Sequence, residues 1–300
     1  MNKNNIKGCL ILALTSLIWG VAFIAQSVGN DHVGPMTFTF CRSLLAVAVL
    51  LPASLIGGKR PMGRALGYAD KTLLKSGALA GVFLFSATAC QQIGLRYTTA
   101  GKAAFITALY IVFTPIAAVL LGKKTAASSW LGIIFGGIGM YLLCMTGESG
   151  MGRGDLIVLA CAMLFTGQIL VIDRYSRQVD CIRMSCVQFA VSSLLSGILM
   201  LALEKPDISA VMSCAVPILY AGILSSGVAY TLQIIGQKHA DVTTATLTMS
   251  LESVFAAIAG YLILNEKMNG IEILGCILIF TAIIVAQIPD FKAVKREKRE

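Results

Sequence analysis

Charged side chains are scarce in this sequence. Asp, Glu, Lys and Arg make up 13% of its 300 residues, whereas about a quarter of a soluble globular protein is charged. Hydrophobic residues make up 57% of the chain, and the mean hydropathy is +0.81. This balance excludes an ordinary soluble domain and predicts a protein that shares its apolar surface with lipid.

Motifs for nucleotide binding, catalysis and metal binding are also missing. The sequence has no glycine-rich phosphate loop followed by Lys and Ser or Thr, which excludes ATP drive of that type. It has no serine nucleophile elbow, and its two histidines, His32 and His239, lie far apart without metal-ligand spacing. We therefore expect no enzyme activity, no catalytic residues, no metal site and no cofactor.

A disulfide framework is not expected either, although the chain has nine cysteines. Most of them fall inside apolar runs: Cys9, Cys41, Cys90, Cys161, Cys186, Cys214 and Cys276. A buried cysteine behaves as a small hydrophobic residue. The odd number and the placement within apolar runs argue against paired cysteines.

Ten apolar runs dominate what the sequence does contain. Each is about 20 residues long with few charges, which is typical of membrane-spanning helices. The runs cover residues 8–29, 34–56, 74–95, 99–121, 128–146, 155–173, 183–203, 213–235, 242–264 and 270–289. The first run is too long for the core of a cleaved secretory signal, so we expect it to be retained. The sequence thus predicts an all-α integral membrane protein with ten transmembrane helices.

The distribution of positive charge predicts the orientation in the membrane. Of the 24 Lys and Arg residues, eighteen fall in the N-terminal segment, the tail and the loops on that side, and five fall on the other side. The remaining one, Arg42, lies inside the second run. Positive charge follows the cytoplasmic face, so both termini of this multi-pass protein of the cell inner (plasma) membrane are expected in the cytoplasm. The net charge of +9 then indicates attraction to anionic membrane lipid and no nucleic-acid partner.

An internal repeat divides the chain into two copies. Residues 94–120 return in altered form as residues 236–262, a constant shift of 142 positions. Ten helices shared between two copies give five each, and an odd number turns the second copy upside down in the membrane. We predict two inverted five-helix repeats, 8–146 and 154–288, followed by a charged cytoplasmic tail, 290–300.

Inverted repeats are a recurring build of secondary transporters, which hold their substrate near the bilayer midplane where the repeats meet. The first helices of the two copies align with a shift of 146, which pairs Trp19 with Phe165 and Arg42 with Gln188. This architecture favours a transporter with a central cavity, although channels and membrane enzymes are also duplicated.

The chain also resembles a known family, the EamA-type permeases of the drug/metabolite transporter superfamily. The segments that carry the resemblance are residues 13–20 and 40–42 in the first copy, and residues 220–230, 251–254 and 265–266 in the second. The resemblance implies a ten-helix carrier with a cavity lined by both copies, and many such carriers export amino acids or other small metabolites. One departure is Ser253, where the family usually has proline, so a proline kink of the ninth helix is not expected. Another is Lys124, where the first copy often carries an acid.

Arg42 and Glu252 are the two ionisable residues placed well inside apolar runs. A charge at this depth costs at least ~2.5–3.5 kcal/mol on insertion scales, so it usually faces protein or water and has a partner. Three interpretations stay open. The pair is structural, as an ion pair or as separate hydrogen-bonded networks; or one of the two contacts the substrate, with Arg42 holding a carboxylate or Glu252 an ammonium; or Glu252 couples transport to protons.

Polar and aromatic residues within the runs complete the candidate site. The amides are Gln91, Gln92, Gln168, Gln188 and Gln233, and the aromatic residues are Trp19, Tyr110, Tyr230 and Phe255. Gln91 and Gln233 are repeat counterparts, as are Tyr110 and Glu252, which places both pairs near the repeat interface. Each of these residues can equally serve helix packing or hydrogen bonding between helices.

Two further features concern packing and partners. Gly132-x-x-x-Gly136, in the run 128–146, permits close helix contact, either within the chain or in a homodimer. Lys102 and Arg96, near run ends, are expected to extend toward the membrane surface. The combined prediction is a secondary transporter that moves a small organic solute, with export of amino acids or related metabolites implied by the resemblance. A lipid scramblase or flippase is the alternative.

Overall fold

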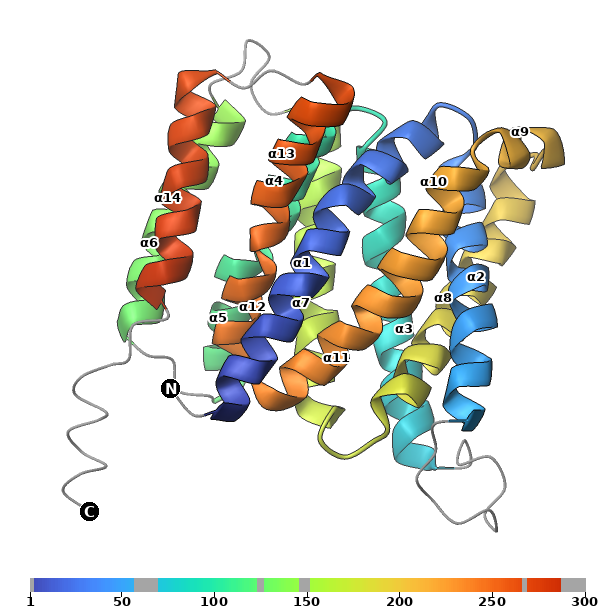
Figure 1. Ribbon diagram of the computed structural model, residues 1–300, viewed down its shortest axis with the longest axis horizontal. Coiled ribbons are helices and arrows are strands. Elements are labelled where there is room, and N and C mark those ends of the chain that lie inside the picture. The colour runs from blue at the N-terminus through green and yellow to red at the C-terminus, as the bar shows by residue number, and fades with distance from the viewer. Residues whose placement is uncertain (1–2, 57–69, 123–126, 146–151, 266–268, 287–300) are drawn as a thin grey trace.

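Every regular element is a helix in the part of the chain that the computed structural model describes, residues 3–56, 70–122, 127–145, 152–265 and 269–286 (Figure 1). The helices are α1 Lys3–Asn30, α2 Pro35–Ile56, α3 Lys71–Gly94, α4 Ala100–Thr107, α5 Tyr110–Leu120, α6 Ala127–Met145, α7 Arg153–Tyr175, α8 Cys181–Leu203, α9 Ile208–Ser213, α10 Ala215–Leu219, the π-helix η1 Tyr220–Ala229, α11 Tyr230–His239, α12 Val242–Met249, α13 Leu251–Leu264 and α14 Gly270–Ala286. The predicted all-α membrane architecture is confirmed at this level. The predicted tail, 290–300, lies outside the described residues.

Within the described ranges, eight helical stretches are long and apolar enough to cross a membrane. They are 5–30, 35–56, 71–94, 100–120, 153–175, 181–203, 215–239 and 242–264. The apolar parts of α6 and α14 are shorter, 130–139 and 273–282 among the described residues, so the count of ten spans stays a prediction. Large apolar side chains such as Leu55, Leu120 and Leu201 are exposed on the outer faces, where lipid would cover them.

Two of the predicted runs, 99–121 and 242–264, are not continuous helices. The first is interrupted between α4 and α5 and the second between α12 and α13, at positions that the 142-residue shift makes equivalent. No proline is needed at the second interruption, because the Ser253 hydroxyl donates to the Ser250 carbonyl at 2.8 Å and the Ser250 hydroxyl donates to Leu247 at 2.7 Å. Hydroxyl groups thus bond to carbonyls at the interruption, and the Ser250 carbonyl also accepts from the Ser253 backbone N–H at 3.1 Å.

The predicted run 213–235 differs from an ordinary helix as well. Its middle is a ten-residue π-helix, η1, joining α10 to α11. π-Helices are rare, and they occur frequently at functional sites. The sequence pattern of apolar residues does not reveal it, because hydropathy is the same for both helix types.

Equivalent residues of the two halves make equivalent contacts. Gly236 of α11 lies against α1, where an added Cβ would be 2.6 Å from Cγ of Leu12. Gly94 of α3 lies against α7, where an added Cβ would be 2.5 Å from Cγ2 of Val158. Gly94 and Gly236 are counterparts at the 142-residue shift, and Leu12 and Val158 are counterparts at the 146-residue shift. Each half therefore lays its first long helix against the other half at a glycine.

The α6 and α14 helices lie side by side at one end of the bundle (Figure 1). Gly139 permits their close approach, since its added Cβ would be 2.6 Å from the Gly275 carbonyl oxygen. Gly132 and Gly136 are buried on the same helix. The glycine-rich face is thus used within the chain, and a homodimer through α6 would use the opposite face with Leu131, Ile134 and Ile138, which are exposed.

Lys102, in the first turn of α4, forms an ion pair with Asp155. Its Nζ lies 2.7 Å from Oδ2 of Asp155, which is only 2% exposed. The same carboxylate accepts from the Thr98 hydroxyl at 2.8 Å and from the Gly152 backbone N–H at 2.9 Å. This ion pair joins the start of α4 to the start of α7, and therefore one half of the chain to the other.

Gly20 of α1 offers a test of helix packing. An added Cβ there would lie 2.5 Å from Cβ of Phe255 and 2.8 Å from the backbone nitrogen of Ala256, on α13. Backbone atoms cannot move aside as a flexible side chain can, so Gly20→Ala is expected to destabilise the protein by about 1–3 kcal/mol. Thermal unfolding of the purified protein should show a lower Tm. Gly137→Ala is the control, since nothing described lies within 4 Å of its added Cβ, and equal Tm values for the two variants would contradict the prediction.

Candidate functional site

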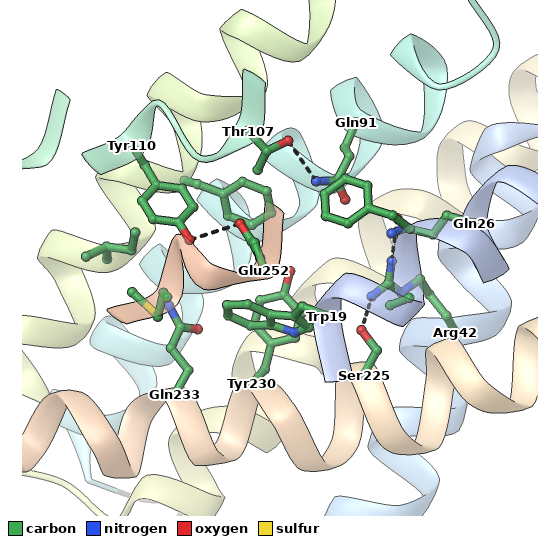
Figure 2. Close-up of a pocket in the computed structure, with 15 residues that line it drawn as sticks. Trp19, Gln26, Arg42, Gln91, Thr107, Tyr110, Ser225, Tyr230, Gln233 and Glu252 are labelled. Atoms are coloured by element: carbon green, nitrogen blue, oxygen red, sulfur yellow. Dashed lines mark hydrogen bonds between the residues drawn. The ribbon is translucent and has the colours of Figure 1, made fainter. Parts of the chain in front are cut away.

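A pocket lies between the two halves of the chain, beside both helix interruptions (Figure 2). The empty space that it defines, part of which is open to the outside, is about 400 Å³. Its lining is Trp19, Ala22, Phe23, Gln26, Arg42, Gln91, Thr107, Tyr110, Phe165, Ile169, Ser225, Tyr230, Gln233, Met249 and Glu252. The structure brings together seven of the eleven candidate residues named from the sequence, and the lining leaves out Gln92, Gln168, Gln188 and Phe255. Their roles in binding remain predictions.

Arg42 is buried and enters the pocket from α2. Its Nε donates to the Ser226 hydroxyl at 2.9 Å, its Nη1 donates to Oε1 of Gln26 at 2.9 Å, and its Nη2 donates to the Ser225 hydroxyl at 3.1 Å. These partners come from α1 and η1, so the guanidinium connects three helices. All three are neutral, and within the described residues no carboxylate lies within ion-pair distance of Arg42. The positive charge is therefore solvated by dipoles and not neutralised.

The π-helix explains how two consecutive serines reach one guanidinium. Ser225 and Ser226 both lie in η1, and both are buried against Arg42. Gly222, one turn earlier, lets α2 approach closely, since its added Cβ would be 2.7 Å from Cβ of Leu45 and 3.2 Å from the Arg42 carbonyl oxygen. The segment 220–230 therefore holds the Arg42 guanidinium through its two serines, which hydropathy alone does not indicate.

Glu252 is buried on another wall, at the start of α13. Its Oε1 accepts from the Tyr110 hydroxyl at 2.9 Å, the residue that begins α5 in the first half. The predicted counterparts of the two repeats thus meet directly at the paired interruptions. Glu252 makes no ion pair within the described residues, and its Oε2 accepts no hydrogen bond there.

Arg42 and Glu252 therefore belong to separate hydrogen-bonded networks. Figure 2 shows Glu252 near the centre beside Tyr110 and Arg42 at the right beside Gln26 and Ser225, with Trp19 and Tyr230 below Glu252 in this view. Of the structural alternatives left open by the sequence, the separate networks are observed and the ion pair is not. The pocket thus holds a guanidinium and a carboxyl group that do not pair with each other.

The glutamines divide into two groups. Gln91 Nε2 donates to the Thr107 hydroxyl at 3.2 Å, at the end of α4. Gln233 Nε2 donates to Oε1 of Gln168 at 3.1 Å, and Gln168 Nε2 lies 3.4 Å from Oε1 of Gln188. The repeat counterparts Gln91 and Gln233 both line the pocket, whereas Gln188, the counterpart of Arg42, closes a neutral amide cluster in the second half.

The rings of Trp19 and Tyr230 form an aromatic floor of the pocket. The rings of Trp19 and Tyr230 are 4.7 Å apart at 55°, and Phe189 meets Tyr230 edge-on at 5.4 Å. Phe255, also a candidate from the sequence, is not in the lining and contacts α1 beside Gly20. Large rings in these orientations fix the shape of one wall and leave little freedom to rearrange.

Sequence reasoning missed three polar residues of the pocket: Gln26, Thr107 and Ser225. For Gln26 a signal was present. It lies seven positions after Trp19, and Trp19, Ala22, Phe23 and Gln26 follow the spacing of one helix face. Thr107 and Ser225 gave no such signal, because each reaches the pocket through a local departure from the regular α-helix.

No group of three or more His, Cys, Asp or Glu residues with metal-binding geometry occurs among the described residues. Eight cysteines in the same part of the chain form no disulfide bond. The chemistry available in the pocket is therefore that of hydrogen bonds, one cation, one carboxyl group and aromatic faces. Such a set is suited to binding a solute.

Comparison with known proteins identifies the family. The EamA-like transporter family matches residues 6–145 and again residues 152–287, nearly the entire chain. The chain belongs to the EamA-like transporter family. The resemblance stated from the sequence is thereby confirmed, and the protein is a multi-pass membrane transporter whose pocket is lined by both EamA-like segments.

Similar proteins agree with this assignment. An uncharacterized transporter of Archaeoglobus fulgidus is 29% identical over 92% of this chain and 84% of its own length. The uncharacterized transporter YoaV of Bacillus subtilis is 20% identical over 93% of this chain and 96% of its own. A chloroplastic WAT1-related protein of Arabidopsis thaliana is 23% identical over 93% of this chain and 69% of its own. One crystal structure, 20% identical, has a TM-score of 0.74 over 96% of this chain and 98% of that one, which supports the fold alone.

Proposed function

We propose that this protein is a secondary transporter that moves a small organic solute, an amino acid or a related metabolite, out of the cell by alternating access. The observation that carries the proposal is the pocket between the repeats, in which Arg42 and Glu252 present opposite charges without neutralising each other. Buried charges are costly unless they are paired. A solute that carries both a carboxylate and an ammonium would supply both missing partners.

The wider architecture in this proposal is ten transmembrane helices arranged as two inverted repeats around a central cavity. The paired interruptions beside Tyr110 and Glu252 support it, because broken helices at the repeat interface are a feature of inverted-repeat carriers. The equivalent glycine contacts at Gly94 and Gly236 support it too, since a symmetric build lets the halves exchange conformations. The excess of positive charge on one side supports an orientation in the cell inner membrane with both termini in the cytoplasm.

The partners in this proposal are the solute and the surrounding membrane lipid, with no nucleic acid. A homodimer through α6 is included as a possible assembly, through the face that carries Leu131, Ile134 and Ile138. Transport needs no nucleotide in this scheme, so the driving force would be the solute gradient or a coupled ion.

Reconstitution tests the proposed function. The purified protein is screened against a panel of amino acids and related metabolites for thermal stabilisation, and the hits are tested for counterflow in proteoliposomes that contain this protein alone. We expect saturable exchange of at least one hit. Lipid scrambling with no exchange of any hit would contradict the carrier and favour the scramblase.

A further inference from the structure

The indole nitrogen of Trp19 is a buried donor without an acceptor. Trp19 is 8% exposed, and its Nε1–H makes no hydrogen bond within the described residues. An indole N–H can only donate, and buried Trp usually finds an acceptor for it. A missing acceptor is costly, so this N–H marks a place where a further oxygen atom would be stabilised.

The position of this N–H relates it to Arg42. Trp19 and Gln26 lie seven residues apart on the pocket face of α1, and Gln26 holds the Arg42 guanidinium. In Figure 2 the indole nitrogen lies on the edge of the ring that faces Ser225 and Arg42. A guanidinium has five N–H groups, and three of those of Arg42 are engaged, by Ser225, Ser226 and Gln26. The Arg42 guanidinium and the Trp19 N–H thus lie on the same side of the pocket.

The opposite side of the pocket has the complementary chemistry. Glu252 keeps one oxygen without a hydrogen bond within the described residues, and Tyr110 orients the other. The rings of Trp19 and Tyr230 line the same pocket, and aromatic faces attract a nearby ammonium. The rest of the lining combines polar side chains, Gln91, Thr107 and Gln233, with apolar ones, Ala22, Phe23, Phe165, Ile169 and Met249.

We propose that the pocket binds an α-amino acid with an apolar side chain in a single orientation, with its carboxylate on Arg42 and the Trp19 Nε1–H and its ammonium on Glu252. The proposal rests on the transport function proposed above, whose site it makes specific. Trp19 is then a specificity-determining residue that selects solutes with a carboxylate, in addition to its place in the aromatic floor. The apolar walls receive the side chain.

The chain offers a direct optical test, because it contains only two tryptophans. Trp130 is exposed on α6, outside the pocket lining, so Trp130→Phe leaves Trp19 as the single tryptophan of the protein. The probes are L-leucine, 3-methylbutylamine, which lacks the carboxylate, and 4-methylpentanoate, which lacks the ammonium. We expect L-leucine to shift the emission of Trp19 saturably. Each analogue lacks one polar partner and is expected to bind at least about tenfold more weakly, which corresponds to about 1.4 kcal/mol.

The matched variants are Trp19→Phe, which keeps an aromatic ring against Tyr230 but removes the N–H, and Trp130→Phe. Binding of radiolabelled L-leucine to purified protein, with the analogues as competitors, gives dissociation constants that do not depend on tryptophan emission or on transport. We expect Trp19→Phe to weaken the binding of L-leucine about tenfold and to leave the binding of 3-methylbutylamine unchanged. Trp130→Phe is expected to change the binding of neither.

Three results would overturn the proposal. One is an equal loss of affinity for L-leucine and for 3-methylbutylamine in Trp19→Phe, which would make Trp19 a packing residue. The second is binding of 4-methylpentanoate as tight as that of L-leucine, which would remove the role of Glu252. The third is no L-leucine binding at all. Failure of the transport function is recognised separately, because it leaves binding intact while no solute is exchanged in proteoliposomes.

Discussion

A Glu252→Gln variant is expected to lose transport of its amino-acid substrate by at least about 30-fold while it reaches the membrane in normal amounts. The amide keeps the size of the side chain and can still accept from the Tyr110 hydroxyl, which lies 2.9 Å from Oε1. It removes the negative charge that would face the substrate ammonium. Removing one partner of a buried charge pair costs about 2–5 kcal/mol, and each 1.4 kcal/mol is about tenfold.

Initial rates of counterflow in proteoliposomes measure this loss, at matched amounts of protein. Tyr110→Phe is the graded comparison, since it keeps the charge of Glu252 and removes only the hydrogen bond that orients it, so a smaller loss is expected. Thermal unfolding of both variants separates a binding defect from a folding defect. Full transport by Glu252→Gln, with unchanged pH dependence and normal expression, would exclude a functional role for this carboxyl group.

An Asp155→Asn variant is expected to destabilise the protein by about 3 kcal/mol or more. Asp155 is 2% exposed. Its carboxylate pairs with Lys102 and accepts hydrogen bonds from the Thr98 hydroxyl and the Gly152 N–H. An asparagine has one acceptor oxygen and a donor group, so it cannot accept from all three and no longer balances the lysine charge. Removing one member of a buried ion pair costs about 3–5 kcal/mol.

The free energy of unfolding of the purified protein, or its Tm, measures this effect. Asp180→Asn is the matched control, because Asp180 is exposed and caps α8 by accepting from the Arg183 N–H at 3.0 Å. Asparagine caps a helix as well as aspartate, so little change is expected there. The charge-exchanged double variant Lys102→Asp with Asp155→Lys should recover only part of the stability, since Thr98 and Gly152 both donate to a carboxylate. A similar Tm for Asp155→Asn and Asp180→Asn would contradict the importance of this junction.

Most of the membrane-spanning segments were predictable because hydropathy is a local property. A run such as 34–56 is apolar on its own account, and α2 follows it as Pro35–Ile56. The interruptions of runs 99–121 and 242–264 were not predictable in this way. They depend on which carbonyls a hydroxyl such as that of Ser253 can reach, and apolar residues continue across both breaks.

The candidate site was predictable in part. Arg42 and Glu252 stood out because an ionisable residue within an apolar run is rare and costly, and the internal repeat added Tyr110 as the counterpart of Glu252. The sequence could not decide whether Arg42 and Glu252 pair. That depends on how α2, η1 and α13 meet in space, where Ser225 and Ser226 of η1 hydrogen-bond to Arg42.

The sequence by itself determined the class of protein, the approximate positions of its helices, the duplication and the family resemblance, because each of these is written in local hydropathy or in a fixed shift along the chain. The tertiary structure alone decided that the two charges occupy one pocket yet stay apart, that Lys102 pairs with Asp155, and that the Trp19 N–H has no acceptor. The physical reason is the same in each case. These features are relations between residues of different helices, and their energies depend on distance and orientation, which a linear pattern of residue types does not contain.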